Sequence, residues 1–167
     1  MPHHPLLSTP RMWLAQPGDA TAICAMPSAG RWRHVNEASS SLRTAALSLG
    51  SDAAAERDLR LLVFEIEREI VAVSAFRRAI EPDLTQLITL VLHQEMRGCW
   101  LRERPRRPLC AVTLEATMRF AAGNGYTRMA VQIANLDTKG IRLAQRSGFG
   151  RVGHADKDHG VWAAILR

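Results

Sequence analysis

The hydrophobic positions of the chain alternate between strand-like and helix-like spacing. Two apolar, β-branched stretches, 59–66 and 69–76, are separated only by Glu67 and Arg68, which predicts a β-hairpin. Because neither of these two residues favours a positive φ angle, we expect a turn longer than two residues. Both alternating faces of 69–76 are apolar, so this strand is expected inside a sheet that is covered on both sides.

A second group of elements follows between residues 86 and 149. The apolar run 86–92 has the length and β-branched content of a buried strand, and 129–133 predicts a shorter strand. Helical spacing predicts one helix at 109–122 and another at 137–148, each ending at a glycine. This part of the chain is therefore expected to form a strand–helix–strand–helix series.

The flanking parts of the chain are less regular. Residues 1–30 are rich in proline, glycine, serine and alanine and form a variable N-terminal segment, with one strand predicted near 21–26. Helical spacing predicts a helix at 33–48 and a short helical turn at 51–58. At the other end, a final hairpin is predicted at 150–166.

Length and element order together predict one α/β domain over residues 1–167, with a mixed, mostly antiparallel central sheet flanked by helices. No apolar run approaches the roughly 20 residues that a membrane helix needs. The first residues contain several prolines and no continuous apolar segment, so they do not form a secretory signal. We therefore expect no membrane association and a cytoplasmic location.

The net charge of +6 comes almost entirely from arginine, because Lys139 and Lys157 are the only lysines. A basic chain favours an anionic partner, either a nucleotide-like cofactor or nucleic acid. The three cysteines are scattered and form no C-x-x-C pair, which indicates neither a disulfide framework nor a zinc site. We expect no metal.

An arginine-rich loop, 97–108, connects strand 86–92 to helix 109–122. The first turn of a helix presents unpaired backbone N–H groups and the positive end of the helix dipole, and both attract anions. Arginines close to that end can hold phosphate oxygens bidentately. The loop therefore predicts a phosphate site, and the alternative is an ordinary crossover with a solvated, charged loop.

Over residues 59–166 the chain resembles the GNAT superfamily of N-acetyltransferases. The clearest part is Asp137-x-x-Gly140-x-x-Leu143, followed by Gly148-Phe149, which is similar to the second cofactor motif of that superfamily. Upstream, the strand 86–92, Arg97-Gly98, the helix and the strand 129–133 follow the order of its central β–α–β unit. The hairpin 59–76 stands where the superfamily has its second and third strands.

The resemblance implies an acyl-CoA N-acyltransferase-like fold and acetyl-CoA as the cofactor. Strand 86–92 is then expected to splay away from 129–133, which leaves its backbone free to pair with the amides of pantetheine. The implied activity is the transfer of an acetyl group to an amine of a small molecule or peptide. The cofactor-binding residues that it implies are Leu90, Val91, Leu92, Arg97, Gly98, Arg106, Arg107, Leu109 and Asp137.

The sequence departs from the superfamily in its pyrophosphate loop and at both of the usual acid–base positions. The glycines of its pyrophosphate loop fall on Trp100 and Arg102, or on Pro108 and Cys110 if they are counted back from Gly125. The loop therefore carries an insertion, and side-chain arginines are expected to replace the close backbone approach that glycine allows.

The usual acid–base residues are also absent. Gln86 stands where the superfamily often has a glutamate base, and Ala144 stands where it often has a tyrosine acid. His93, at the end of strand 86–92, has a side chain with a suitable pKa and is the candidate catalytic base. A simply solvated histidine and an amine that loses its proton through water are the alternatives.

Three functions stay open at this point. The first is an N-acetyltransferase, with acetyl-CoA and an unidentified amine acceptor that binds between residues 30–58 and the hairpin 60–80. The second is a non-catalytic acyl-CoA sensor of the same fold. The third is a nucleic-acid-binding module that uses the arginine loop, which is disfavoured because Trp100 is the only aromatic side chain there. A homodimer is left open.

Overall fold

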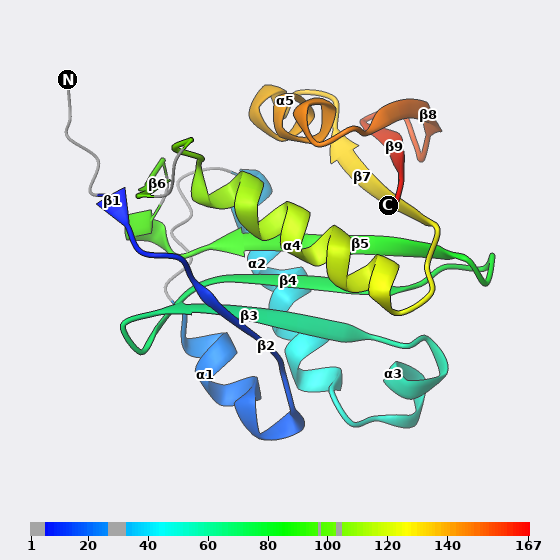
Figure 1. Ribbon diagram of the computed structural model, residues 1–167. Coiled ribbons are helices and arrows are strands. Elements are labelled where there is room, and N and C mark those ends of the chain that lie inside the picture. Colours follow the sequence, from blue (N-terminus) through cyan, green and yellow to red (C-terminus); the bar gives the residue numbers. More distant parts are fainter. Residues whose placement is uncertain (1–5, 27–32, 97, 103–104) are drawn as a thin grey trace.

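The fold is built on a seven-stranded sheet. The computed structural model describes residues 6–26, 33–96, 98–102 and 105–167, with the backbone alone over 33–39 (Figure 1). The strand order across the sheet is β2-β3-β4-β5-β7-β9-β8, and only the central pair β5–β7 is parallel. The strands are β2 (Arg11–Leu14), β3 (Arg60–Ile66), β4 (Glu69–Arg78), β5 (Leu84–Leu92), β7 (Arg128–Ala134), β8 (Gly150–His154) and β9 (His159–Ile165).

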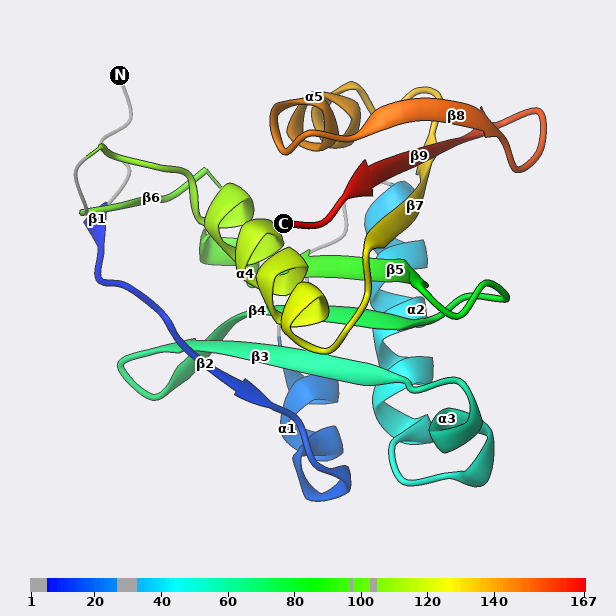
Figure 2. The ribbon, with the colours of Figure 1, turned by 45° about the vertical axis from the view of Figure 1, so that its right-hand side comes forward.

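Helices cover both faces of this sheet. Helices α1 (Ala20–Ala25) and α2 (Arg33–Ser48) pack on one face, and α4 (Leu109–Gly123) and α5 (Thr138–Arg146) lie on the other (Figures 1 and 2). A short helix, α3 (Asp52–Glu56), precedes β3, with the Ser51 hydroxyl accepting a hydrogen bond from its first turn. The predicted α/β class, with a mixed and mostly antiparallel sheet flanked by helices, is confirmed.

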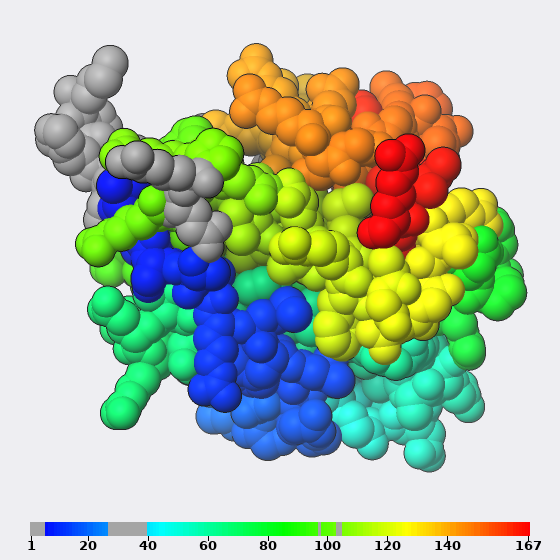
Figure 3. Space-filling model, in the orientation of Figure 1, coloured from blue at the N-terminus to red at the C-terminus, as the bar shows by residue number. Residues whose placement is uncertain are grey.

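Two apolar layers hold the helices against the sheet. The layer under α2 joins Leu42 and Ala46 of the helix to Val63, Val73 and Val91 of the strands. The layer under α4 and α5 is built from the side chains Phe64, Phe76, Leu87, Leu109, Leu114, Met129, Ala144 and Phe149. Figure 3 shows one face of the molecule, on which α4 lies between the N-terminal strands and α5 with β8. The strands β3, β4 and β5 contribute to both layers, as their apolar patterns predict.

The turn between β3 and β4 differs from the prediction. Glu67 and Arg68 have φ angles of 52° and 71°, and Ile66 pairs directly with Glu69. The turn therefore has two residues, and the expectation of a longer one was wrong. Two successive left-handed residues give the twist that a tight hairpin needs, and the pairing of two buried strands outweighs a local cost of roughly 1–2 kcal/mol per residue.

The N-terminal segment also differs from the prediction. Residues Ala20–Ala25 form α1, so the strand predicted near 21–26 was wrong. The segment follows a 3-10 turn, η1 (Pro17–Asp19), and its alanines favour helix, while Ile23 alone is buried against α2. The first strand of the sheet is β2, in which Trp13 pairs with Val63.

Three short elements complete the description. The pair β1 (Leu6–Leu7) and β6 (Trp100–Leu101) forms a separate two-stranded parallel sheet, and η2 (Gln94–Met96) follows β5. No helix in the described part of the chain is long and apolar enough to cross a membrane.

Candidate functional site

The two central strands separate partway along their length. The parallel pairing of β5 and β7 runs only from Leu84 with Arg128 to Leu87 with Val131. Beyond that point β5 continues to Leu92 and β7 continues to Ala134, and Figure 2 shows the two strands diverging. Within the described residues the edge of β5 that faces β7 therefore has no partner strand at Leu90–Leu92.

A cleft of about 400 Å³ fills the space between the separated strands. We call it the β5–β7 cleft. Its lining comes from both faces of the sheet: α4 and α5 contribute on one face and α2 on the other. The lining residues are Ser41, Leu87, Ile88, Thr89, Leu90, Leu92, Cys110, Leu114, Val131, Gln132, Ile133, Ala134, Asp137, Gly140, Leu143, Ala144, Phe149 and His159.

A β-bulge in β5 lies where the strands separate. Ala75 of β4 pairs with Thr89, but the next residue, Phe76, pairs with Leu87, so Ile88 is an extra residue. The bulge changes which side chains face each helix layer. Leu87 packs in the α4 layer and Ile88 in the α2 layer, and after the bulge Leu90 packs on the α4 side.

The three predicted β5 residues therefore divide between two environments. The side chains of Leu90 and Leu92 line the cleft, whereas Val91 is buried against α2. A strand that binds an extended chain along its edge does so through its backbone, so all three residues still lie along the open edge of β5.

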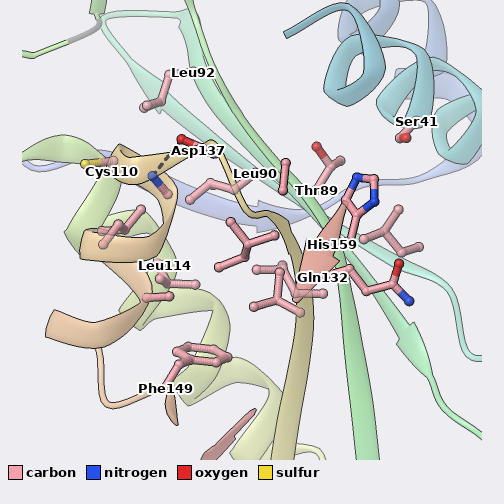
Figure 4. A pocket seen from close by; sticks show the side chains of 18 residues that line it. Ser41, Thr89, Leu90, Leu92, Cys110, Leu114, Gln132, Asp137, Phe149 and His159 are labelled. Carbon is pink, nitrogen blue, oxygen red and sulfur yellow. Dashed lines mark hydrogen bonds between the residues drawn. The ribbon is translucent and has the colours of Figure 1, made fainter. Parts of the chain in front are cut away.

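The N-termini of two helices meet one end of the cleft. Figure 4 places Cys110 of α4, Asp137 and Leu92 together at that end. The Asp137 side chain caps α5 by accepting a hydrogen bond from Gly140 N–H at 2.9 Å. Leu109 is buried, and its N–H donates to the carbonyl of Cys99 at 3.0 Å. Burial raises the pKa of the Cys110 thiol, which favours its neutral form over a thiolate nucleophile.

The described residues of the arginine-rich loop, 98–102 and 105–108, fold back onto the protein. Leu101 is fully buried, its N–H donates to the carbonyl of Arg107 at 2.8 Å, and Trp100 bridges to Pro108. Gly98 has a φ angle of 75°, a conformation that glycine adopts without strain. Arg97 lies outside the described residues. The insertion is thus anchored on the α4 layer through Leu101.

The two other arginines that were predicted to bind the cofactor have different surroundings. The guanidinium of Arg107 forms an ion pair with Glu115, two turns into α4. Arg106 is exposed. Of these two guanidiniums, Arg106 is therefore the one without an intramolecular carboxylate in the described structure.

The residues considered for acid–base chemistry do not gather in the cleft. His93 lies just beyond β5, where its Nδ1 accepts a hydrogen bond from Glu95 N–H at 3.2 Å. Gln86 accepts two hydrogen bonds from Arg77 at 3.2 and 3.1 Å. Among the described residues that line the cleft, neither His93 nor Gln86 is present, and Ala144 is buried in its wall.

A histidine that the sequence analysis did not select does line the cleft. His159, the first residue of β9, lies with Ser41 and Gln132 at the end opposite Cys110 (Figure 4). Its Nδ1 is 3.0 and 3.1 Å from the two carboxylate oxygens of Asp156. This hydrogen bond lowers the pKa of Asp156, and the carboxylate also accepts from the backbone N–H of Asp158.

The sequence contained part of this signal. An Asp and a His three residues apart in a turn can pair locally, and Asp156 and His159 have that spacing. What brings the pair to the cleft is the antiparallel pairing of His159 with Ala134 of β7, which single-sequence patterns do not specify. No group of three or more metal-binding side chains is assembled in the part of the chain that the structure describes.

Comparisons with known proteins identify this architecture. No protein-family model and no curated protein matches the sequence. A structure assigned to the GNAT acetyltransferase family, from Desulfovibrio desulfuricans, aligns with a TM-score of 0.73 at 10% identity, covering 94% of this chain and 100% of that one.

Two further matches are complexes with coenzyme A. The PaiA N-acetyltransferase of Thermoplasma acidophilum aligns with a TM-score of 0.65 at 8% identity, over 93% of this chain and 99% of that one. The enzyme AAC(6')-Ib, in complex with ribostamycin and coenzyme A, aligns with a TM-score of 0.70 at 12% identity, over 95% and 94%. The chain has the fold of the GNAT N-acetyltransferases.

Proposed function

We propose that the protein transfers an acetyl group from acetyl-CoA to an amine. The observation that carries the proposal is the β5–β7 cleft, in which a parallel strand pair separates at a bulge and leaves the Leu90–Leu92 edge of β5 without a partner strand. An unpaired strand edge offers alternating N–H and C=O groups to an extended ligand that contains amides. The pantetheine arm of CoA is such a ligand.

The walls of the cleft suit this arm. Leu90, Leu92, Leu143 and Phe149 provide apolar surface beside the open backbone of β5. A narrow, mostly apolar cleft with a few polar groups is the usual form of a small-molecule site. This lining supports the placement of the pantetheine arm along β5.

The end of the cleft near Cys110 suits the phosphates. The N-terminal turn of α4 meets it, and the backbone N–H groups and dipole of that helix favour anions, whereas the N-terminus of α5 is already capped by the Asp137 carboxylate. Arg106 of the preceding loop is exposed and can add a guanidinium. Acetyl-CoA would supply an activated acetyl thioester, and the protein would hold it with the acyl end near the bulge.

This arrangement leaves the α2 side of the sheet for the amine. The polar lining residues on that side are Ser41, Gln132 and His159, and they lie beside the apolar side chain of Ile88. An acceptor that enters there would approach the acetyl group from the face opposite α4 and α5. The amine nitrogen would then replace the CoA sulfur on the acetyl carbon, with the protein excluding bulk water.

Calorimetry with CoA and acetyl-CoA tests the proposal directly, together with CoA-release assays over a panel of amines. Leu143→Trp should abolish binding by filling the cleft, whereas Leu136→Trp is the matched control, because Leu136 is exposed and is not a lining residue. Binding in the wild type and in the control variant supports the proposal. Absence of binding at millimolar acetyl-CoA overturns it. Tight binding without turnover of any amine would instead identify a non-catalytic acyl-CoA sensor.

A further inference from the structure

We propose that His159, positioned by Asp156, is the catalytic base that accepts the proton of the acceptor amine. The inference rests on the proposed function and adds a residue to it. His159 lines the cleft on the α2 side, where the acceptor would enter, and it is only partly exposed, with 34% of its side chain accessible.

The contacts of the imidazole fix its orientation. Both oxygens of Asp156 lie within 3.1 Å of Nδ1, and the same carboxylate accepts the backbone N–H of His159 at 2.9 Å. A carboxylate at Nδ1 favours the tautomer with the proton on that atom, which leaves Nε2 as a free acceptor. The negative charge of Asp156 also stabilises the imidazolium that forms when Nε2 takes up a proton.

The other groups around His159 are compatible with this role. Ser41, Thr89 and Gln132, which line the cleft beside it, are neutral. On the neighbouring strand β8, Arg151 and His154 interact with each other, at 3.0 Å between Nη2 and Nδ1. Within the turn that carries Asp156, the remaining charged side chains are those of Lys157 and Asp158.

The step balances with this single base. The neutral amine nitrogen forms a bond to the acetyl carbon and gives one proton to Nε2 of His159. The bond between that carbon and sulfur breaks, and its electron pair leaves with the CoA sulfur as thiolate. His159 then releases its proton to water, and the thiolate takes one from water.

His159→Gln is the decisive variant, with His93→Gln as the matched control. General-base help is typically worth about 10²–10⁴-fold, so His159→Gln should lower kcat by that factor without changing CoA affinity, and its pH–rate profile should lose the limb set by the imidazole. His93→Gln should keep both the rate and the profile. Asp156→Asn should give a smaller loss of kcat, because the carboxylate no longer holds the imidazole in the Nδ1–H tautomer.

A readout that does not depend on turnover separates this role from a structural one. The Nδ1–H tautomer of the His159 imidazole, followed by 15N NMR, should lose population in Asp156→Asn while the melting temperature and CoA affinity stay close to the wild type. An unchanged pH–rate profile in a folded, CoA-binding His159→Gln overturns the proposal. Failure of CoA to bind the wild type would instead remove the proposed function itself.

A separate observation bears on the class of acceptor. A second cavity, of about 430 Å³, adjoins the cleft through two shared lining residues, Ser41 and the bulge residue Ile88. It lies between α2, α3 and the sheet, and we call it the α2–α3 pocket. Serine and threonine hydroxyls of α2 line it, together with the guanidinium-bearing residues Arg57 and Arg77.

The charge of this pocket is one-sided. Among the described residues that line it there is no carboxylate, and the acidic residues of the adjoining helix α3, Asp52 and Glu56, are not lining residues. Two of the nitrogens of Arg77 donate to Gln86, which holds the guanidinium in place and leaves further N–H groups for a ligand. We infer that the acceptor amine also carries an acidic group, a carboxylate or a phosphate.

Matched pairs of amines test this inference. β-Alanine with propylamine isolates a carboxylate, and phosphoethanolamine with ethanolamine isolates a phosphate. At least one acidic member should have a kcat/KM at least tenfold above its neutral partner, and Arg77→Met or Arg57→Met should remove that advantage. Arg142→Met, on the exposed side of α5, is the control. Equal or faster acetylation of the neutral partners overturns the inference while leaving the proposed function in place.

Discussion

The hydroxyl of Tyr126 donates a hydrogen bond to Oδ2 of Asp58 at 2.5 Å and joins two parts of the chain that are 68 residues apart. Asp58 has a φ angle of 49° in the turn before β3, and its other oxygen accepts from Arg60. Tyr126, the only tyrosine of the chain, is therefore engaged at the closed end of the sheet and not in the cleft.

Tyr126→Phe should destabilise the fold by about 1.5–3 kcal/mol, the cost of a lost hydrogen bond to a charged group. Burial and the bond to Asp58 raise the pKa of Tyr126 from 10.0 to about 12. Because the pKa is raised in the folded state, this stabilisation is complete below pH 10 and is lost as the pH rises towards 12. Urea unfolding of both proteins between pH 7 and 11 checks this. A wild-type protein that loses no more stability than Tyr126→Phe over that range would contradict it.

The contact that Asp83 makes at the paired end of β5 and β7 should contribute less to the stability of the fold in acid. Hydrogen bonds from Arg128 and Thr127 lower the pKa of Asp83 from 3.8 to about 2. Because the pKa of Asp83 is lower in the folded state, its ionised carboxylate stabilises the fold. This stabilisation is complete above the pKa of the unfolded chain, 3.8, and is lost as the pH falls through 2. We expect the stability gap between the wild type and Asp83→Asn to close between pH 4 and pH 2. Thermal unfolding across that range is the measurement, and a constant gap would show that the contact is not linked to protonation.

The two arginines before α4 should differ in their effect on CoA. Arg106→Ala should weaken CoA binding by about 1.5–3 kcal/mol, the loss of a hydrogen bond to a charged group. Arg107→Ala should do less, because Glu115 already pairs with that guanidinium. Glu115→Gln should therefore strengthen CoA binding by releasing Arg107. Calorimetry at two salt concentrations tests the ranking, and equal affinities for all four proteins would assign the phosphate site to helix N–H groups alone.

Gln86→Glu should not accelerate acetyl transfer. Gln86 lies at the position that often carries a base in GNAT enzymes, but its side chain is bonded to Arg77 and is not a lining residue of the cleft. A glutamate there would form an ion pair with Arg77, which lowers its pKa and makes it a weaker base. The CoA-release rate at pH 6–8 is the measurement. A rate increase of tenfold or more would show that the carboxylate reaches the acceptor.

Much of the fold could be predicted because its main elements have strong, local patterns. The strands β3, β4 and β5 and the helix α4 all follow from apolar spacing and glycine stops. The two-residue strands β1 and β6 could not be predicted, since their only signal is the tertiary pairing of Leu6 with Trp100. The tight turn at Glu67 was missed because strand pairing overrides the preference of the residue itself.

The candidate site was less predictable for a related reason. Strand 86–92 is apolar at almost every position, so a change of face within it leaves no polar residue to mark it. The sequence therefore gave no sign of the bulge at Ile88, or of the different surroundings of Val91 and Leu92. His159 was overlooked because its place in the cleft depends on which residue of β7 it faces.

The extra residue at Ile88 also shifts the parity of β5 partway along the strand. Odd-numbered Leu87 and even-numbered Leu90 face the same layer only because one residue has been added between them. Removing Ile88 would join Leu87 directly to Thr89 and restore regular alternation, so Leu90 would still face α4 and Val91 would still face α2. The deletion would remove the bulge itself, and with it the local bend and added twist at the point where β5 separates from β7. A single-residue deletion at Ile88 would therefore change the path of the strand and not the faces of its side chains, whereas a substitution at the same position would leave that path intact.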